Sequence, residues 1–248
     1  MLSDPFFLLT AALAILITGI SKGGFGGGLG MVAVPLMALT ISPGQAAAIM
    51  LPILCLMDLF ALWHFRGHAS WQQLRILLPA ALLGIGLGTV GFHYLNDEQL
   101  KLMIGFIALG FVSHSFLRRH NTSPQPASVI RGGFWGTVSG FTSFGIHAGG
   151  PPLSVYLLPQ RLDKTVFAAT TVVFFTSVNL LKVIPYIWLG QFSTTNLTTS
   201  LLLAPLAPLG IWLGRYLHDR LSDRGFFIIC YGLLAVTGCK LVWDGLAG

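Results

Sequence analysis

Residues 19–28 read Gly-Ile-Ser-Lys-Gly-Gly-Phe-Gly-Gly-Gly and interrupt an apolar stretch near the start of the chain. A second interruption, residues 143–152, reads Ser-Phe-Gly-Ile-His-Ala-Gly-Gly-Pro-Pro. The second half of the sequence also repeats the first, so that Gly84 recurs 126 positions later as Gly210. In a membrane protein, duplicated halves with interrupted apolar segments are typical of a secondary transporter whose site lies between the halves.

Composition places the chain in a bilayer. Hydrophobic residues make up 54% of the sequence and charged residues 9%, and the mean hydropathy is +0.78. The net charge of +6 comes from short basic pairs such as Arg118 and Arg119, which lie between apolar stretches and form no continuous basic face. We therefore expect no nucleic acid as a partner. The apolar stretches predict contact with lipid. The three cysteines lie in apolar stretches without metal-ligand spacing, so we expect no metal and no cofactor.

The apolar stretches predict an all-α integral membrane protein. A spanning helix needs ~20 apolar residues, and six stretches come close: residues 44–64, 74–95, 99–117, 165–189, 197–217 and 225–243. Two further stretches, 5–40 and 132–159, are broken by glycine and are predicted to form hairpins of two short helices. The arms of the second hairpin have about 12 or 13 residues each, too short to cross ~30 Å of hydrocarbon, so we expect them to be re-entrant.

We therefore predict two repeats, residues 1–120 and 128–248, within a single membrane domain. Each repeat is a glycine-broken hairpin followed by three spanning helices. Backbone that leaves helical geometry at membrane depth must face protein or a water-filled cavity, which makes both glycine breaks candidate walls of a site.

Lysine and arginine counts predict the sidedness of the loops. Four loops are basic and predicted to be cytoplasmic: Arg66 with Arg75, Arg118 with Arg119 and Arg131, Arg161 with Lys164, and Arg215 with Arg220 and Arg224. The loops at residues 97–98 and 190–196 are poor in positive charge and are placed outside, together with both termini. Gly67 and its repeat partner Gly190 then lie on opposite sides of the membrane, so the repeats are predicted to be inverted.

The first break offers an anion site. Backbone N–H groups around Gly26, Gly27 and Gly28, and the N-terminus of a helix expected near Leu29, attract negative charge. Ser21 and Lys22 precede these glycines and join the predicted site. The alternative is that Lys22 is only the cytoplasmic tip of a fully spanning hairpin.

The second break offers a matching site. Prolines at positions 151–152 suit the first turn of a helix, so a second helix N-terminus faces Gly149 and Gly150. The two helix N-termini are predicted to meet from opposite sides and to form one anion cradle. His147 is a candidate donor to the anion and a candidate proton carrier; the alternative is a histidine that bonds only to backbone.

Polar residues inside the predicted spans complete the candidate site. Asn179, Lys182 and Tyr186 lie in the stretch 165–189, where an ionisable residue usually faces the protein interior or a pathway. Snorkelling of Lys182 toward the outer interface is the alternative. Asp58 is the only carboxylate well inside a span, and it is either a proton carrier or an ion-pair partner.

The order of these motifs resembles the TauE/SafE family of sulfite exporters. The resemblance rests on the glycine-rich break running into residues 34–36, the Gly-Gly-Pro-Pro break at 149–152 and the run from Asn179 through Lys182 and Tyr186 to Gly190. It implies a permease of the bacterial inner membrane for small anions such as sulfite, sulfoacetate or related organosulfonates.

The predicted function is export of such anions, because a negative cell interior expels a monoanion without a coupling ion. A proton-coupled importer of small organic anions is the first alternative, with Asp58 or His147 coupling protons. An intramembrane serine hydrolase is a second alternative, because residues 19–23 match G-x-S-x-G with Ser21 as nucleophile. A non-transporting membrane subunit is a third. The sequence leaves the substrate and the oligomeric state open.

Overall fold

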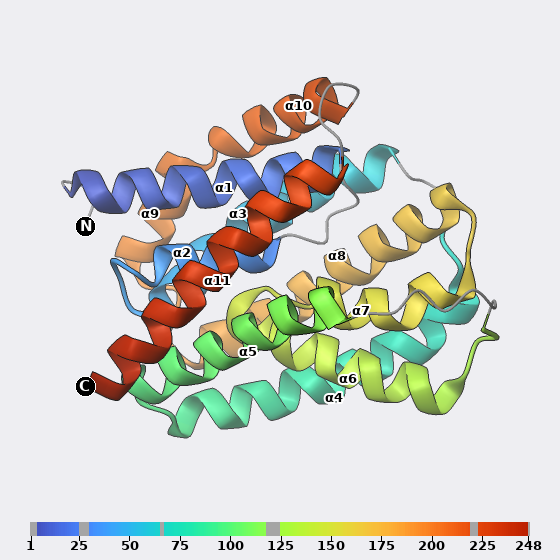
Figure 1. Cartoon of the computed structure of the whole chain (residues 1–248), viewed down its shortest axis with the longest axis horizontal. Helices are drawn as coiled ribbons and strands as arrows, with labels where there is room; N and C mark the ends of the chain where they lie inside the picture. The colour runs from blue at the N-terminus through green and yellow to red at the C-terminus, as the bar shows by residue number, and fades with distance from the viewer. Residues whose placement is uncertain (1–3, 25–29, 65–66, 118–124, 219–222, 248) are drawn as a thin grey trace.

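The computed structural model describes residues 4–24, 30–64, 67–117, 125–218 and 223–247 (Figure 1). This part of the chain contains helices and no strand. The helices are α1 (Pro5–Gly24), η1 (Gly30–Val32), α2 (Ala33–Met37), α3 (Pro43–His64), α4 (Trp71–Tyr94), α5 (Asp97–Leu117), α6 (Val129–Ile146), α7 (Gly150–Leu157), η2 (Leu158–Gln160), α8 (Lys164–Trp188), α9 (Thr194–Leu203), α10 (Leu206–His218) and α11 (Asp223–Ala247). The predicted all-helical fold is confirmed.

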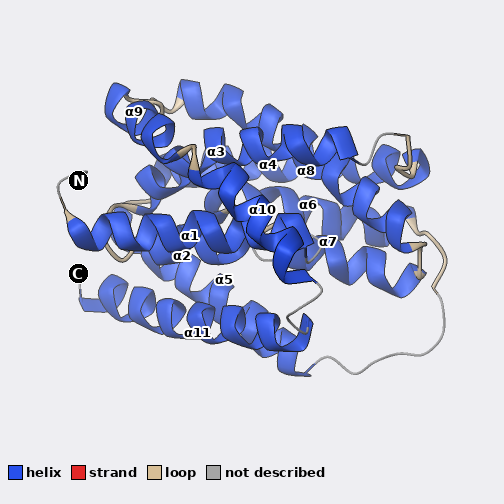
Figure 2. Ribbon diagram, turned by 90° about the horizontal axis from the view of Figure 1, so that it is seen from above, coloured by secondary structure: helices blue, strands red, loops and turns tan. Residues whose placement is uncertain are grey.

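Helices of the two halves pack against each other throughout the bundle (Figures 1 and 2). The main pairs are α4 with α6, α1 with α10, α5 with α11 and α3 with α8. Each pair joins a helix of the first half to one of the second. The five-residue α2 is buried at every position, so the first break leads into the interior of the bundle.

Glycines make two of these contacts possible. A Cβ added at Gly84 of α4 would lie 2.0 Å from the carbonyl oxygen of Thr137 in α6. A Cβ added at Gly19 of α1 would lie 2.8 Å from the Cα of Gly210 in α10. Small residues let helix backbones approach this closely in membranes. Gly84 and Gly210, which are partners in the predicted repeat, each lie at one of these close contacts.

Both glycine-broken segments differ from the predicted hairpins of two short arms. Helix α1 runs unbroken for 20 residues, and Pro5–Gly23 is long and apolar enough to cross a membrane. The predicted arms of 12 or 13 residues in the second hairpin are wrong, since α6 has 18 residues and α7 has 8. In the first segment, Gly19 and Gly23 stay helical and pack closely against α10 instead of ending the helix. In the second segment, α6 begins at Val129, before the predicted stretch, and continues to Ile146.

Five segments of the described chain are long and apolar enough to span a membrane: Pro5–Gly23, Pro43–Trp63, Trp71–Phe92, Thr165–Trp188 and Thr194–Leu217. Four of the six predicted spans are among them. The predicted spans 99–117 and 225–243 are helical, as α5 and α11, but do not belong to this set. The predicted span 197–217 is divided into α9 and α10 at residues 204–205, where a proline falls.

The helices lie roughly along one direction, and their ends gather at two ends of the bundle (Figure 1). One end holds the end of α3, the starts of α4, α6 and α8, and the end of α10. The opposite end holds the start of α1, the α4–α5 and α8–α9 connections and the end of α11. Exposed tryptophans stand at helix termini, with Trp63 and Trp71 at the first end and Trp188 at the second, as membrane-interface anchors do.

Candidate anion site

The second break is formed by the end of α6 and the start of α7. Helix α6 ends at His147, which has a left-handed backbone with φ 54° and donates its N–H to the carbonyl of Ser143. A left-handed residue is a common way to end a helix, although glycine usually fills the position. Pro151 and Pro152 lie in the first turn of α7, as predicted. The chain changes direction between α6 and α7, and this turn places the His147 ring against α3 and α8.

Lys182 of α8 reaches the end of α6. Its side chain is 0% exposed, and its Nζ lies 2.9 Å from the carbonyl oxygen and 3.1 Å from the Oγ of Ser143. The same Nζ lies 2.7 Å from Nδ1 of His147. This geometry excludes snorkelling of Lys182 toward the interface. A positive charge at a helix C-terminus also stabilises the helix.

The contacts of His147 fix its protonation state. Its Nε2 lies 2.9 Å from the carbonyl oxygen of Ala47 in α3, and since a carbonyl only accepts, Nε2 carries the proton. Its Nδ1 then accepts from the ammonium of Lys182. With the ammonium form of Lys182 as the donor, His147 is neutral, and no hydrogen-bond partner of Lys182 in the described chain is a carboxylate.

Asp58 of α3 binds the remaining polar side chains. It is 2% exposed, forms an ion pair with Lys22 of α1 and accepts from Nδ2 of Asn179 in α8 at 2.6 Å. The Lys22 side chain is only 12% exposed, so Lys22 is not the solvent-exposed tip of a hairpin. Asp58 was predicted to be either a proton carrier or an ion-pair partner, and in the structure it forms an ion pair.

The two buried pairs lie at similar positions in the two halves of the sequence. Lys22, in the last turn of α1, and His147, directly after α6, are 125 positions apart. Asp58 and Lys182 are 124 positions apart and lie on α3 and α8, which pack against each other. The first half thus contributes a neutral ion pair, and the second half a positively charged lysine–histidine pair.

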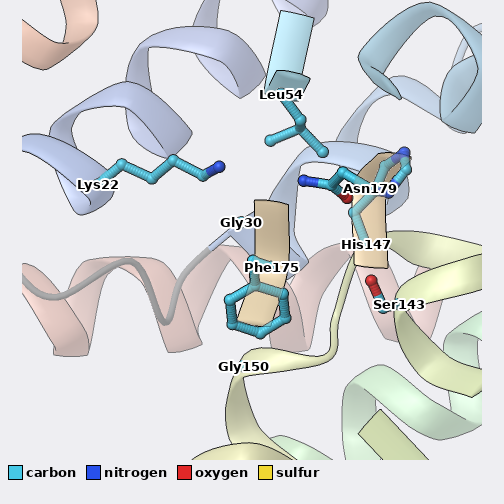
Figure 3. A pocket seen from close by; sticks show the side chains of 8 residues that line it. All are labelled: Lys22, Gly30, Leu54, Ser143, His147, Gly150, Phe175 and Asn179. Atoms are coloured by element: carbon cyan, nitrogen blue, oxygen red, sulfur yellow. The ribbon is translucent and has the colours of Figure 1, made fainter. Parts of the chain in front are cut away.

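One member of each pair, Lys22 and His147, lines a cavity that is partly open to solvent (Figure 3), while Asp58 and Lys182 do not line it. The residues that line it come from both breaks and from α3 and α8: Lys22, Gly30, Leu54, Ser143, His147, Gly150, Phe175 and Asn179. In Figure 3 the Lys22 ammonium and the Asn179 amide face each other across the cavity, with Gly30 and Gly150 from the two breaks nearby.

Several predicted site residues take other places. Gly26, Gly27 and Gly28 lie outside the described residues. Ser21 is buried in α1 and is not part of the cavity lining. Tyr186 donates its hydroxyl to the carbonyl of Phe144 at 2.6 Å, which caps the end of α6.

Gly149 lies at the break but is packed against protein. A Cβ added there would lie 2.8 Å from both the carbonyl oxygen and the Oγ of Ser139, and 2.9 Å from Phe175. A larger residue at this position would therefore disturb packing before it met an anion. The helix expected near Leu29 also differs, because α2 begins at Ala33 after the single turn of η1.

Four cavity residues were missed by the sequence reasoning: Gly30, and three residues that each lie four positions before one that was found. Ser143 precedes His147, Phe175 precedes Asn179, and Leu54 precedes Asp58. Residues i and i+4 share a helix face. Extending each candidate by one helical turn would have found all three.

The geometry gives no support to the serine hydrolase alternative. Both ring nitrogens of His147 are engaged, by Ala47 and by Lys182, so His147 does not serve Ser21 as a base. No group of three histidine, cysteine, aspartate or glutamate side chains suited to a metal occurs among the residues that the structure describes.

Comparison with known proteins gives one match. A family model described as sulfite exporter TauE/SafE matches residues 11–241. No curated protein and no solved structure matches the chain. The match includes both breaks and every residue that lines the cavity.

Proposed function

Because the chain belongs to the sulfite exporter TauE/SafE family, a family of membrane transporters, we propose that it exports sulfite or a related organosulfonate from the bacterial cytoplasm. Sulfoacetate is among the candidate substrates. The cavity between the two breaks is the proposed binding site, at the interface of two inverted repeats.

One observation carries the proposal: the charge of Lys182 is fully buried beside the cavity and is not matched by a carboxylate in the described chain. A buried charge is costly unless it is paired. An anion in the cavity would supply the missing negative charge. Ser143 and His147 line the cavity and contact Lys182, so they couple the anion to the lysine.

Backbone groups support the same position. The first intrahelical bond of α7 runs from the N–H of Leu153 to the carbonyl of Gly149. The N–H groups of Gly149 and Gly150 precede this bond, and residues 151–152 are prolines without N–H groups. The start of α7 at Gly150, which lines the cavity, therefore places the positive end of a short helix dipole near it.

Transport direction follows from charge. A monoanion that leaves a negative interior gains ~2.3 kcal/mol per 100 mV, so export needs no coupling ion. Asp58 is held in an ion pair with Lys22, which supports export over proton-coupled import.

We expect proteoliposomes that contain the protein to release sulfite faster than protein-free liposomes, with a rate that saturates and rises when the interior is made negative. Release is measured with radiolabelled sulfite and a potassium diffusion potential. Release at the protein-free rate would reject the function, and accumulation driven only by a proton gradient would favour import.

The proposed inverted topology places the end of α3 and the start of α4 in the cytoplasm and the start of α9 outside. The end of α3, the starts of α4, α6 and α8 and the end of α10, which border these basic segments, lie toward one end of the bundle (Figure 1), and this supports the arrangement. In a cysteine-free background, we expect cysteine at Thr195 to react with an impermeant thiol reagent from outside, while cysteine at its repeat partner Gln72 does not. Both positions are exposed. Equal labelling of the two from one side would contradict the inverted repeats.

A further inference from the structure

The buried charges around the cavity leave a net charge of one positive unit. We propose that this balance selects anions with a single negative charge, and that Asp58 is the residue that sets it. The inference rests on the proposed anion transport and defines its substrate class more closely.

The charge balance follows from contacts. Lys22 and Asp58 form an ion pair and cancel, and the second carboxylate oxygen of Asp58 accepts from Asn179. Lys182 contributes one positive charge in its ammonium form, and His147 is neutral because Nε2 donates to a carbonyl and Nδ1 accepts from Lys182. Two ammonium groups and one carboxylate leave a single positive charge.

In the part of the chain that the structure describes, the neighbouring Tyr186 and Cys55 add no charge to this balance. Tyr186 of α8 is protonated because its hydroxyl donates to a carbonyl oxygen. Cys55 of α3 is a free thiol. Residues 25–29, which connect α1 to η1, have no ionisable side chain. The ion pair of Lys240 with Asp244 belongs to α11 and is partly exposed.

The balance has a direct consequence for binding. A monoanion in the cavity brings the net charge of the buried groups to zero. A dianion leaves one unpaired negative charge in the site, and the carboxylate of Asp58, which contacts the lining residues Lys22 and Asn179, repels it; both effects are costly. If Asp58 loses its charge, the two lysines together match a dianion.

The proposal is tested with two ligands of nearly equal size that share a sulfonate group. Sulfoacetamide has one negative charge at neutral pH, and sulfoacetate has two. Calorimetric titration of the purified protein in detergent gives the affinity ratio of the two ligands. We expect the wild-type protein to bind sulfoacetamide at least tenfold more tightly, and Asp58→Asn to bind sulfoacetate more tightly. Asp244→Asn, which removes a partly exposed carboxylate from another ion pair, should keep the wild-type ratio.

A second pair of variants keeps the test decisive if Asp58→Asn does not fold. Lys22→Met leaves a net charge of zero and should bind both ligands at least tenfold more weakly. Adding Asp58→Asn to Lys22→Met removes both charges of the Lys22–Asp58 ion pair, so that the one positive charge of Lys182 remains, and should restore the preference for sulfoacetamide. An unchanged ligand ratio in Asp58→Asn, or equal binding of both ligands by the wild-type protein, would overturn the selection by charge. Failure of the folded wild-type protein to bind either ligand would instead overturn the anion site itself.

Discussion

Replacement of Lys182 by methionine is expected to weaken binding of methanesulfonate at least tenfold, about 1.4 kcal/mol. The change removes the one buried charge that lacks a carboxylate partner in the described chain, while methionine fills a similar volume. Calorimetric titration in detergent measures the loss. Lys182→Arg should retain part of the affinity, because it keeps the charge but not the position of the three donors.

Two controls separate charge from helix capping. Lys240→Met makes the same chemical change at a largely exposed lysine of α11 and should leave the affinity unchanged. Tyr186→Phe removes the neighbouring bond at the end of α6, from the Tyr186 hydroxyl to Phe144, without a change in charge. If Tyr186→Phe lowers the affinity as much as Lys182→Met, the role of Lys182 is to cap α6 and not to attract the anion.

The second large effect concerns the contact between the halves. Gly84→Ala is expected to destabilise the protein by about 1–3 kcal/mol, because the new Cβ would lie 2.0 Å from a backbone oxygen of Thr137 in α6. Gly86→Ala, two residues along the same helix, is the matched control, since nothing lies within 4 Å of a Cβ there. Thermal unfolding in detergent compares the two. Equal melting temperatures would show that α4 and α6 do not pack through Gly84.

Much of the fold follows from composition and periodicity. The apolar stretches located the helices, and the prolines at positions 151–152 located the start of α7. The sequence did not show which glycines end a helix and which allow close packing. Gly19 and Gly23 stay in α1 because they face α10, and this contact joins residues nearly 200 positions apart. Helix propensity alone would favour a break at these glycines.

The candidate site was predicted mainly from charged residues inside apolar stretches, because burying a charge is costly and usually serves a function. Lys182 and Asp58 were notable because each lies inside an apolar stretch, and the structure places both in the interior. Their partners depend on the tertiary fold: Asp58 binds Lys22 across 36 positions and Asn179 across 121. The left-handed backbone of His147 was equally unpredictable, since glycines lie on either side of it at positions 145 and 149.

The central claim is that a sulfur-containing anion binds in the cavity between Lys22 and Lys182. Bromomethanesulfonate is a small monoanion whose bromine can be located by anomalous diffraction from crystals of the wild-type protein. We predict a bromine peak in the cavity that Ser143, His147 and Asn179 line. A peak elsewhere in the protein, with this cavity empty at a saturating concentration of the ligand, would contradict the claim.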